Sequence, residues 1–145
     1  MHQVAIPSRR FSLDLTLSCG QVFRWERNGD WWQGIVGNEV IRIRQEGDLL
    51  LIESGRKETI RSYFQLDLDL DRILRSIDRD PVIHGAIRRC RGLRIIRQDP
   101  WECLASYICA TYANIPGIKK KIRLLSESFG ELLETESGTF YRFPS

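Results

Sequence analysis

The chain has 145 residues, of which 42% are hydrophobic and 28% charged, as in a globular protein with a core. Its net charge of +3 is by itself weak support for a polyanionic partner such as nucleic acid. No apolar run approaches the length that spans a bilayer, and the N-terminal MHQVAIPSRRF lacks the apolar stretch of a signal peptide. We therefore expect no membrane partner.

Cysteine and histidine are too scattered in this sequence to predict a metal centre. The four cysteines form no CxxC motif and no cluster with either histidine: Cys19, Cys90, Cys103, Cys109, His2 and His84. We expect buried free thiols, as in a reducing cytoplasm, rather than a disulfide framework. His84 has no partner nearby in sequence, which favours a surface or packing role. Neither a metal ligand nor a cofactor is predicted.

The first third of the chain alternates apolar and polar residues at the period of a β-strand. Four segments follow this pattern: 21–26, 30–36, 40–45 and 48–54. Between the first two lies Asn28–Gly29, a strong hairpin signal because both residues tolerate a positive φ. The pattern predicts an antiparallel meander of about four strands with one solvent-exposed face.

The entry to the first predicted strand is the string LSCGQVFRW, residues 17–25. Phe23 and Trp25 share one face and are predicted core residues, whereas Arg24 points the other way and could reach a phosphate or a carboxylate. The simplest role for Gln21 is a hydrogen bond within the turn. Gly20 marks either a plain turn or a place where something approaches the backbone closely.

At Arg56 the period of the pattern changes to that of a helix, and segments 57–66, 70–78 and 81–90 are predicted helices. Aspartates alternate in LDLDLDR at positions 67, 69 and 71. They indicate a helix start and a solvated edge; a metal site is the less favoured alternative.

A second pair of helices follows. Asp99 and Glu102 form a capping-box pattern around Pro100, which predicts a helix over 100–112. This helix is apolar nearly all round, as a central buried helix would be. Asn114 and Pro116 end it and begin another helix, with one apolar stripe: Ile118, Ile122, Leu125 and Phe129. Gly130 is predicted as the left-handed residue that follows this helix.

The start of the last helix is basic, with the sequence IPGIKKKIR. Its free backbone N–H groups, together with Lys119 and Lys120, could bind a phosphate. A solubilising face on an amphipathic helix is the simpler interpretation. Just ahead, Tyr112 offers a ring for stacking and Asn114 an amide that could reach base edges.

Three strings in this order resemble the 8-oxoguanine DNA glycosylases: LDLTLSCGQVFRW, YFQLDLDL and GLRIIRQDPWECLASYICATYANI. The resemblance runs from about Phe11 to Ser145. It implies an α+β fold, in which an N-terminal antiparallel β-sheet packed with helices (1–98) is followed by the start of an all-α helix–hairpin–helix glycosylase domain (99–145). TFYRFPS then ends the chain without a closing element, as though it were cut inside a larger fold.

The resemblance implies base-excision repair of damaged double-stranded DNA. An enzyme of this family flips out 8-oxoguanine, attacks the sugar with a lysine and cleaves the strand through a Schiff base. The family's glycine carbonyl that accepts the N7 hydrogen of the oxidised base corresponds to Gly20. The lysine and its assisting aspartate are expected beyond Ser145, so residues 1–145 contain no catalytic residue and are expected to be inactive alone.

The resemblance also implies which residues bind DNA and where the protein works. Tyr112, Asn114, Lys119 and Lys120 are the expected DNA contacts. The complete enzyme is expected to be a monomer, cytoplasmic in a prokaryote or nuclear in a eukaryote. In residues 1–145 the central helix lacks its partners, so its apolar surface is expected to be exposed and the chain to self-associate.

One departure from the family concerns the base opposite the lesion. Eukaryotic members carry three asparagines, an isoleucine and, later, an arginine that address the unpaired cytosine. Only Asn114 and Ile115 match, Gly117 stands in the place of the arginine, and Tyr112 replaces the first asparagine. We therefore expect weak selectivity for the opposite base, with Tyr112 filling the vacancy left by the missing family residues.

Two other functions stay open at this point. The chain could be a non-catalytic DNA-binding module, because it lacks the nucleophile. It could also belong to a related glycosylase that acts on another damaged base, such as an alkylated one. Borohydride trapping on oxidised DNA distinguishes these alternatives.

Overall fold

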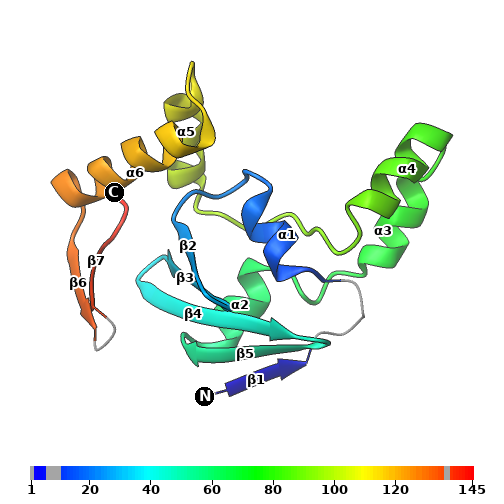
Figure 1. The fold of residues 1–145 in the computed structure, drawn as a ribbon, viewed down its shortest axis with the longest axis horizontal. Helices are drawn as coiled ribbons and strands as arrows, with labels where there is room; N and C mark the ends of the chain where they lie inside the picture. Colours follow the sequence, from blue (N-terminus) through cyan, green and yellow to red (C-terminus); the bar gives the residue numbers. More distant parts are fainter. Residues whose placement is uncertain (1, 6–10, 136–137) are drawn as a thin grey trace.

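A five-stranded antiparallel sheet, in the order β1-β5-β4-β3-β2, dominates the computed structural model, which describes residues 2–5, 11–135 and 138–145 (Figure 1). Its strands are β1 (His2–Ala5), β2 (Trp25–Asn28), β3 (Trp31–Val36), β4 (Glu39–Glu46) and β5 (Leu49–Ser54). The predicted meander is confirmed as β2–β5, and the α+β class is confirmed with it. The sequence did not predict β1, which pairs with β5 and extends the sheet beyond the meander.

The three hairpin loops between β2 and β5 have two residues each and begin with a glycine at positive φ, for example Gly29 at +60°. Asn28 pairs with Trp31, so the first loop is Gly29–Asp30. The predicted turn at Asn28–Gly29 is therefore wrong by one residue. The first strand also starts later than predicted, because residues 21–24 lie outside the sheet.

One face of the sheet packs against α1 (Leu13–Ser18), which the sequence did not predict, and α2 (Lys57–Tyr63). The core takes apolar residues from both helices, the sheet and the segment near Ile96: Phe11, Leu13, Leu17, Val22, Trp25, Trp32, Ile41, Ile43, Leu50, Ile52, Ile60, Tyr63, Phe64, Leu66 and Ile96. The indole Nε1 of Trp25 donates to the Tyr63 hydroxyl at 2.9 Å. Burial raises the pKa of that hydroxyl, which therefore stays protonated.

The opposite face of the sheet is partly exposed, as predicted. On it two guanidinium groups lie over the Trp31 ring, with Cζ of Arg42 at 4.8 Å and Cζ of Arg44 at 4.9 Å from the ring centroid. Both arginines are about a third exposed and also pair with nearby glutamates. Around Trp31 this face is therefore covered by cation–π contacts.

Helices α3 (Leu70–Ile77) and α4 (Pro81–Arg89) form a pair that stands away from the sheet (Figure 1), and neither has a buried residue. The Asp69 carboxylate caps α3 by accepting from Arg72 N at 3.0 Å, which confirms the predicted helix start. In the described ranges no three His, Cys, Asp or Glu side chains gather as metal ligands would. His84 is exposed and pairs with Asp78 at 3.0 Å.

Helices α5 (Pro100–Ala110) and α6 (Ile115–Phe129) pack on each other beside the sheet. The α5 helix is not a buried helix in this chain, because only Ala105 and Ser106 are buried. Its apolar side is exposed, as expected for the isolated chain, and Tyr107 is 77% exposed. On α6, the predicted stripe is buried at Ile118 and Ile122 and half-buried at Leu125, whereas Phe129 is exposed and the prediction is wrong there.

The chain continues after α6 with a hairpin of β6 (Leu132–Thr135) and β7 (Gly138–Tyr141), which the sequence did not predict. Gly130 also differs from its prediction, since its φ is −85° and not left-handed. A Cβ at Gly130 would lie 1.9 Å from the carbonyl oxygen of Arg142. This glycine lets the end of the hairpin approach the end of α6.

The cysteines are free, but the expectation that they are buried is wrong. Cys19, Cys90 and Cys103 are exposed and Cys109 is half-buried. Cys19 and Cys90 lie at the ends of α1 and α4, and Cys103 and Cys109 lie on α5. None of the described helices combines the length and apolarity needed to cross a bilayer.

Candidate functional site

The site predicted around Gly20 is a turn between α1 and β2, in which Gly20 itself is half-buried. Cys19 ends α1, and Gly20 follows in the left-handed region at φ +90°. No hydrogen bond to the Gly20 carbonyl is formed among the described residues. The turn therefore presents a carbonyl acceptor that a ligand could use.

The side chain of Gln21 fixes this turn. Its Nε2 donates to the carbonyls of Thr16 at 3.1 Å and Arg94 at 2.8 Å, and its Oε1 accepts from Ile96 N at 2.9 Å. The predicted bond within the turn is thus present, and two bonds to a segment 73 and 75 residues away are added. Gln21 therefore holds Gly20 against the main body of the chain.

The segment that receives Gln21 is itself anchored by a buried arginine. The Arg94 guanidinium donates to the carbonyls of Gln65 at 2.6 Å and Leu68 at 3.3 Å. Burial lowers the pKa of Arg94, and Asp67 opposes that effect. These two bonds tie the segment that receives Gln21 to the residues that follow α2, so the support behind Gly20 is anchored at a second place in the chain.

The second predicted contact region is the loop between α5 and α6. Tyr112 is fully exposed and adopts φ +51°, a left-handed conformation that is uncommon for a residue with a side chain. Asn114 caps α6, since its Oδ1 accepts from Gly117 N at 2.9 Å. The capping bond uses the amide oxygen, which leaves the Nδ2 donor of Asn114 to face a ligand.

The turn and the loop are neighbours in the fold. A Cβ built on Gly20 would lie 3.8 Å from Cδ1 of Ile115, the residue that follows Asn114. Residues that are 95 positions apart in the sequence therefore share one site, a proximity that local sequence patterns do not reveal.

The three consecutive lysines of α6 have different roles. Lys119 Nζ donates to the carbonyl of Trp25 at 3.2 Å, and Lys121 Nζ donates to that of Cys109 at 3.0 Å. Lys121 thereby satisfies a carbonyl near the C-terminal end of α5. Lys120 is exposed and has no hydrogen-bond partner within the described residues. Of the two lysines predicted to bind DNA, Lys119 uses one N–H on the Trp25 carbonyl and Lys120 uses none, and both keep their positive charge.

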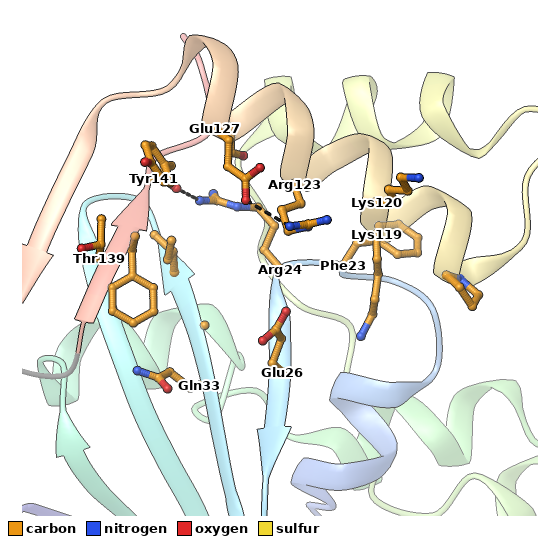
Figure 2. A pocket seen from close by; sticks show the side chains of 15 residues that line it. Phe23, Arg24, Glu26, Gln33, Lys119, Lys120, Arg123, Glu127, Thr139 and Tyr141 are labelled. Carbon is orange, nitrogen blue, oxygen red and sulfur yellow. Dashed lines mark hydrogen bonds and ion pairs between the residues drawn. The ribbon is translucent and has the colours of Figure 1, made fainter.

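A cavity of about 590 Å³ lies between α6, β7 and the outer face of β2 and β3 (Figure 2). Phe23 and Phe140 supply apolar walls, and Lys120 and Arg123 supply positive charge. Arg123 is paired with Glu127 at 3.3 Å. Gly20 does not line this cavity, which is thus separate from the Gly20 turn.

An ion pair that the sequence predicted only in part joins the segment just before β2 to α5. Arg24 Nη1 lies 3.1 Å from Oε2 of Glu102, which confirms a carboxylate partner for Arg24. The backbone half of the predicted capping box is confirmed, because Asp99 Oδ1 accepts from Glu102 N at 2.9 Å. The Glu102 side chain turns to Arg24 instead of completing the box. Burial raises the pKa of Glu102, and Arg24 opposes that rise.

The comparisons with known proteins agree with this architecture. The profile of the family described as "8-oxoguanine DNA glycosylase, N-terminal domain" matches residues 3–104. N-glycosylase/DNA lyase OGG1 of Arabidopsis thaliana is 28% identical over 92% of this chain and 40% of its own length. The N-glycosylase/DNA lyase of Saccharomyces cerevisiae is 28% identical over 99% of this chain and 43% of its own length. The chain thus spans less than half the length of these curated relatives.

Solved structures are similar over nearly all of the chain. MBOgg1 in complex with a low-affinity DNA ligand has a TM-score of 0.89 and 36% identity, over 98% of this chain and 50% of that one. The 8-oxoguanine glycosylase/lyase of Clostridium acetobutylicum, in complex with double-stranded DNA containing cytosine opposite 8-oxoguanine, has a TM-score of 0.86 and 34% identity. That match covers 93% of this chain and 48% of the other.

Proposed function

The chain belongs to the 8-oxoguanine DNA glycosylase family, and we propose that its complete natural protein excises 8-oxoguanine from duplex DNA and then cleaves the strand. In this proposal residues 1–145 supply part of the base-recognition surface. The nucleophilic lysine and its assisting aspartate lie outside them. The relatives are named N-glycosylase/DNA lyase, which supports both steps of the reaction.

The observation that carries the proposal is the unpaired carbonyl of Gly20 in a turn fixed by Gln21. Oxidation of guanine places a hydrogen on N7, where the normal base has a lone pair. A fixed carbonyl accepts a hydrogen bond from the oxidised base and faces a lone pair of the normal one. Discrimination is strong because, with the normal base bound, the Gly20 carbonyl and the N7 lone pair are both acceptors and both stay unpaired.

The chain also contributes to DNA binding beside the flipped base. In this proposal Tyr112, which is fully exposed, fills the space that the base leaves, and the exposed Lys120 contacts a phosphate. At this site Asn114 offers only its Nδ2 donor, and Gly117 offers no side chain. We therefore propose weak selectivity for the base opposite 8-oxoguanine.

Borohydride trapping tests the catalytic assignment. The complete natural protein is expected to form a covalent adduct with duplex DNA containing 8-oxoguanine, and residues 1–145 are expected to form none. An adduct with residues 1–145 would place the nucleophile inside this chain. Failure of the complete protein, or equal trapping on DNA with an alkylated base, would contradict the proposed substrate. Duplexes with each of the four opposite bases should react within a few-fold of one another.

The variant Gly20→Ala tests the carrying observation. Its side chain has room, but φ +90° is strained for alanine, so the carbonyl is expected to turn away and 8-oxoguanine excision to fall about 100-fold. Gly37→Ala is the matched control, because Gly37 has φ +56° and open space around it in a hairpin of the sheet. This control should lose stability by about 1 kcal/mol and keep its excision rate per folded molecule.

A further inference from the structure

Arg24 connects three segments that are distant in sequence. Its side chain is 8% exposed, and besides the Glu102 carboxylate its guanidinium reaches the carbonyl of Tyr141 and the ring of Phe143, whose centroid is 5.9 Å away. Figure 2 shows Arg24 extending from the start of β2 to the end of β7. We call residues 2–5 and 11–98 the sheet unit, and residues 99–135 and 138–145 the helical unit; all these partners of Arg24 lie in the helical unit.

Arg27 makes the same kinds of contact three residues later. It pairs with the Asp14 carboxylate at 3.0 Å, donates to the Gly29 carbonyl at 3.0 Å and lies 6.0 Å from the centroid of the Trp32 ring. Its side chain is 50% exposed and every one of these partners belongs to the sheet unit. The two arginines differ in burial and in what they join, which makes Arg27 a matched control for Arg24.

The Arg24–Glu102 pair resists separation. Removal of one partner would leave an unpaired charge in a protein interior, which is costly, whereas the exposed Arg27–Asp14 pair is solvated when broken. Lys119 adds a weaker link between the units through its bond to the Trp25 carbonyl. These links hold the start of β2 against α5 and α6.

Both elements of the candidate site depend on this link. Gly20 is four residues before Arg24, and the helix that carries Glu102 ends at Ala110, just before Tyr112. A rotation of one unit against the other would move Gly20 past Ile115, with which it is nearly in contact. The carbonyl and the loop therefore keep their relative positions only while the units are locked.

We propose that Arg24 and Glu102 are positioning residues that set the place of the Gly20 carbonyl relative to the Tyr112–Asn114 loop, and thereby the preference for 8-oxoguanine over guanine. The proposal rests on the function proposed above. Recognition by one hydrogen bond is sensitive to position, and a displacement of about 1 Å can cost about 100-fold in rate. Binding of undamaged DNA through phosphates is far less sensitive to such a displacement.

The test uses single-turnover excision of 8-oxoguanine by the complete natural protein, with rates taken per folded molecule. Arg24→Gln and Glu102→Gln are expected to slow excision 10- to 100-fold and to change the Kd for undamaged duplex by less than about twofold. Arg24→Lys keeps the charge, but its single ammonium group cannot replace the planar guanidinium that bonds both Glu102 and the Tyr141 carbonyl. This variant should therefore recover only part of the rate. Arg27→Gln should change neither quantity by more than about twofold.

Hydrogen exchange provides a readout that does not depend on activity. Arg24→Gln is expected to speed amide exchange in residues 19–25 and 110–115 and to leave β4 and β5 unchanged. Equal slowing by Arg24→Gln and Arg27→Gln, or a parallel loss of excision and undamaged-DNA binding, would overturn the proposal. If the unsubstituted protein releases no 8-oxoguanine, the proposed function fails, and the exchange result still decides whether the pair locks the units.

Discussion

The sheet unit and the helical unit both contain large aromatic residues, but they bury them very differently. In the sheet unit, Trp25 and Phe64 are fully enclosed by the sheet and two helices. In the helical unit, Trp101 is 50% exposed and Tyr107 is exposed even further. Apolar composition drives burial only where another element offers a surface to pack against. The sheet unit contains that surface and the described helical unit does not.

Truncation of one aromatic ring in each unit gives the largest expected contrast. Phe64→Ala removes a ring in contact with Phe11, Trp25 and Tyr63, and should lower the free energy of unfolding by about 3–5 kcal/mol. Tyr107→Ala should change it by less than about 0.5 kcal/mol, because its ring contacts mostly solvent. Urea denaturation of residues 1–145 measures both values. A comparable loss in both variants would mean that α5 is covered in solution, as in a self-associated chain.

The same contrast explains what the sequence could predict. Local signals predicted the caps at Asp99 and Asn114, because a cap depends on residues three positions away. The strand period predicted β3–β5 because it too is a local pattern, which repeats every two residues. Helix α1 was missed because its six residues are too short for a helical period to show.

Contacts between distant segments were beyond prediction. The sequence suggested an acceptor for Arg24 but gave no means of choosing Glu102, 78 residues away. It likewise gave no sign that Gln21 would hold Arg94 and Ile96, or that Gly20 would meet Ile115. Resemblance to a family located Gly20 where physical patterns alone left it as a turn.

The two units also differ in how they pair an indole N–H, and this gives a smaller contrast. Tyr63→Phe removes the acceptor of the Trp25 indole inside the core, and the unpaired donor should cost about 1–3 kcal/mol. Trp101 donates to the Pro144 carbonyl at 2.8 Å where water can replace either group. Trp101→Phe should therefore cost less than about 0.5 kcal/mol in the same urea measurement. A loss above 1 kcal/mol in Trp101→Phe would show that the end of the chain is tightly held by α5.

The smallest expected effects concern two glutamates with pKa shifts of opposite sign. Glu39 lies within the sheet unit; burial raises its pKa, but bonds from the side chain and backbone of Arg56 and from Thr59 outweigh burial, and the net pKa is lowered from 4.5. Glu102 lies at the contact of the two units, where burial raises its pKa above 4.5 despite Arg24. The two carboxyls should therefore change stability in opposite directions as the pH rises.

The sign follows from which state holds the proton. Folding favours the ionised form of Glu39, so its contribution is complete above pH 4.5 and is lost as the pH falls through its lower folded pKa. Folding favours the protonated form of Glu102, so stability decreases as the pH rises from 4.5 through its higher folded pKa.

Relative to the unsubstituted chain, Glu39→Gln should lose most stability above pH 4.5 and least at low pH. Between pH 4.5 and neutrality the unsubstituted chain should lose stability relative to Glu102→Gln, because the variant lacks the carboxyl that ionises. Urea midpoints measured across pH 3–8 compare the three proteins, and parallel pH profiles for the two variants would show that both carboxyls lie in equivalent surroundings.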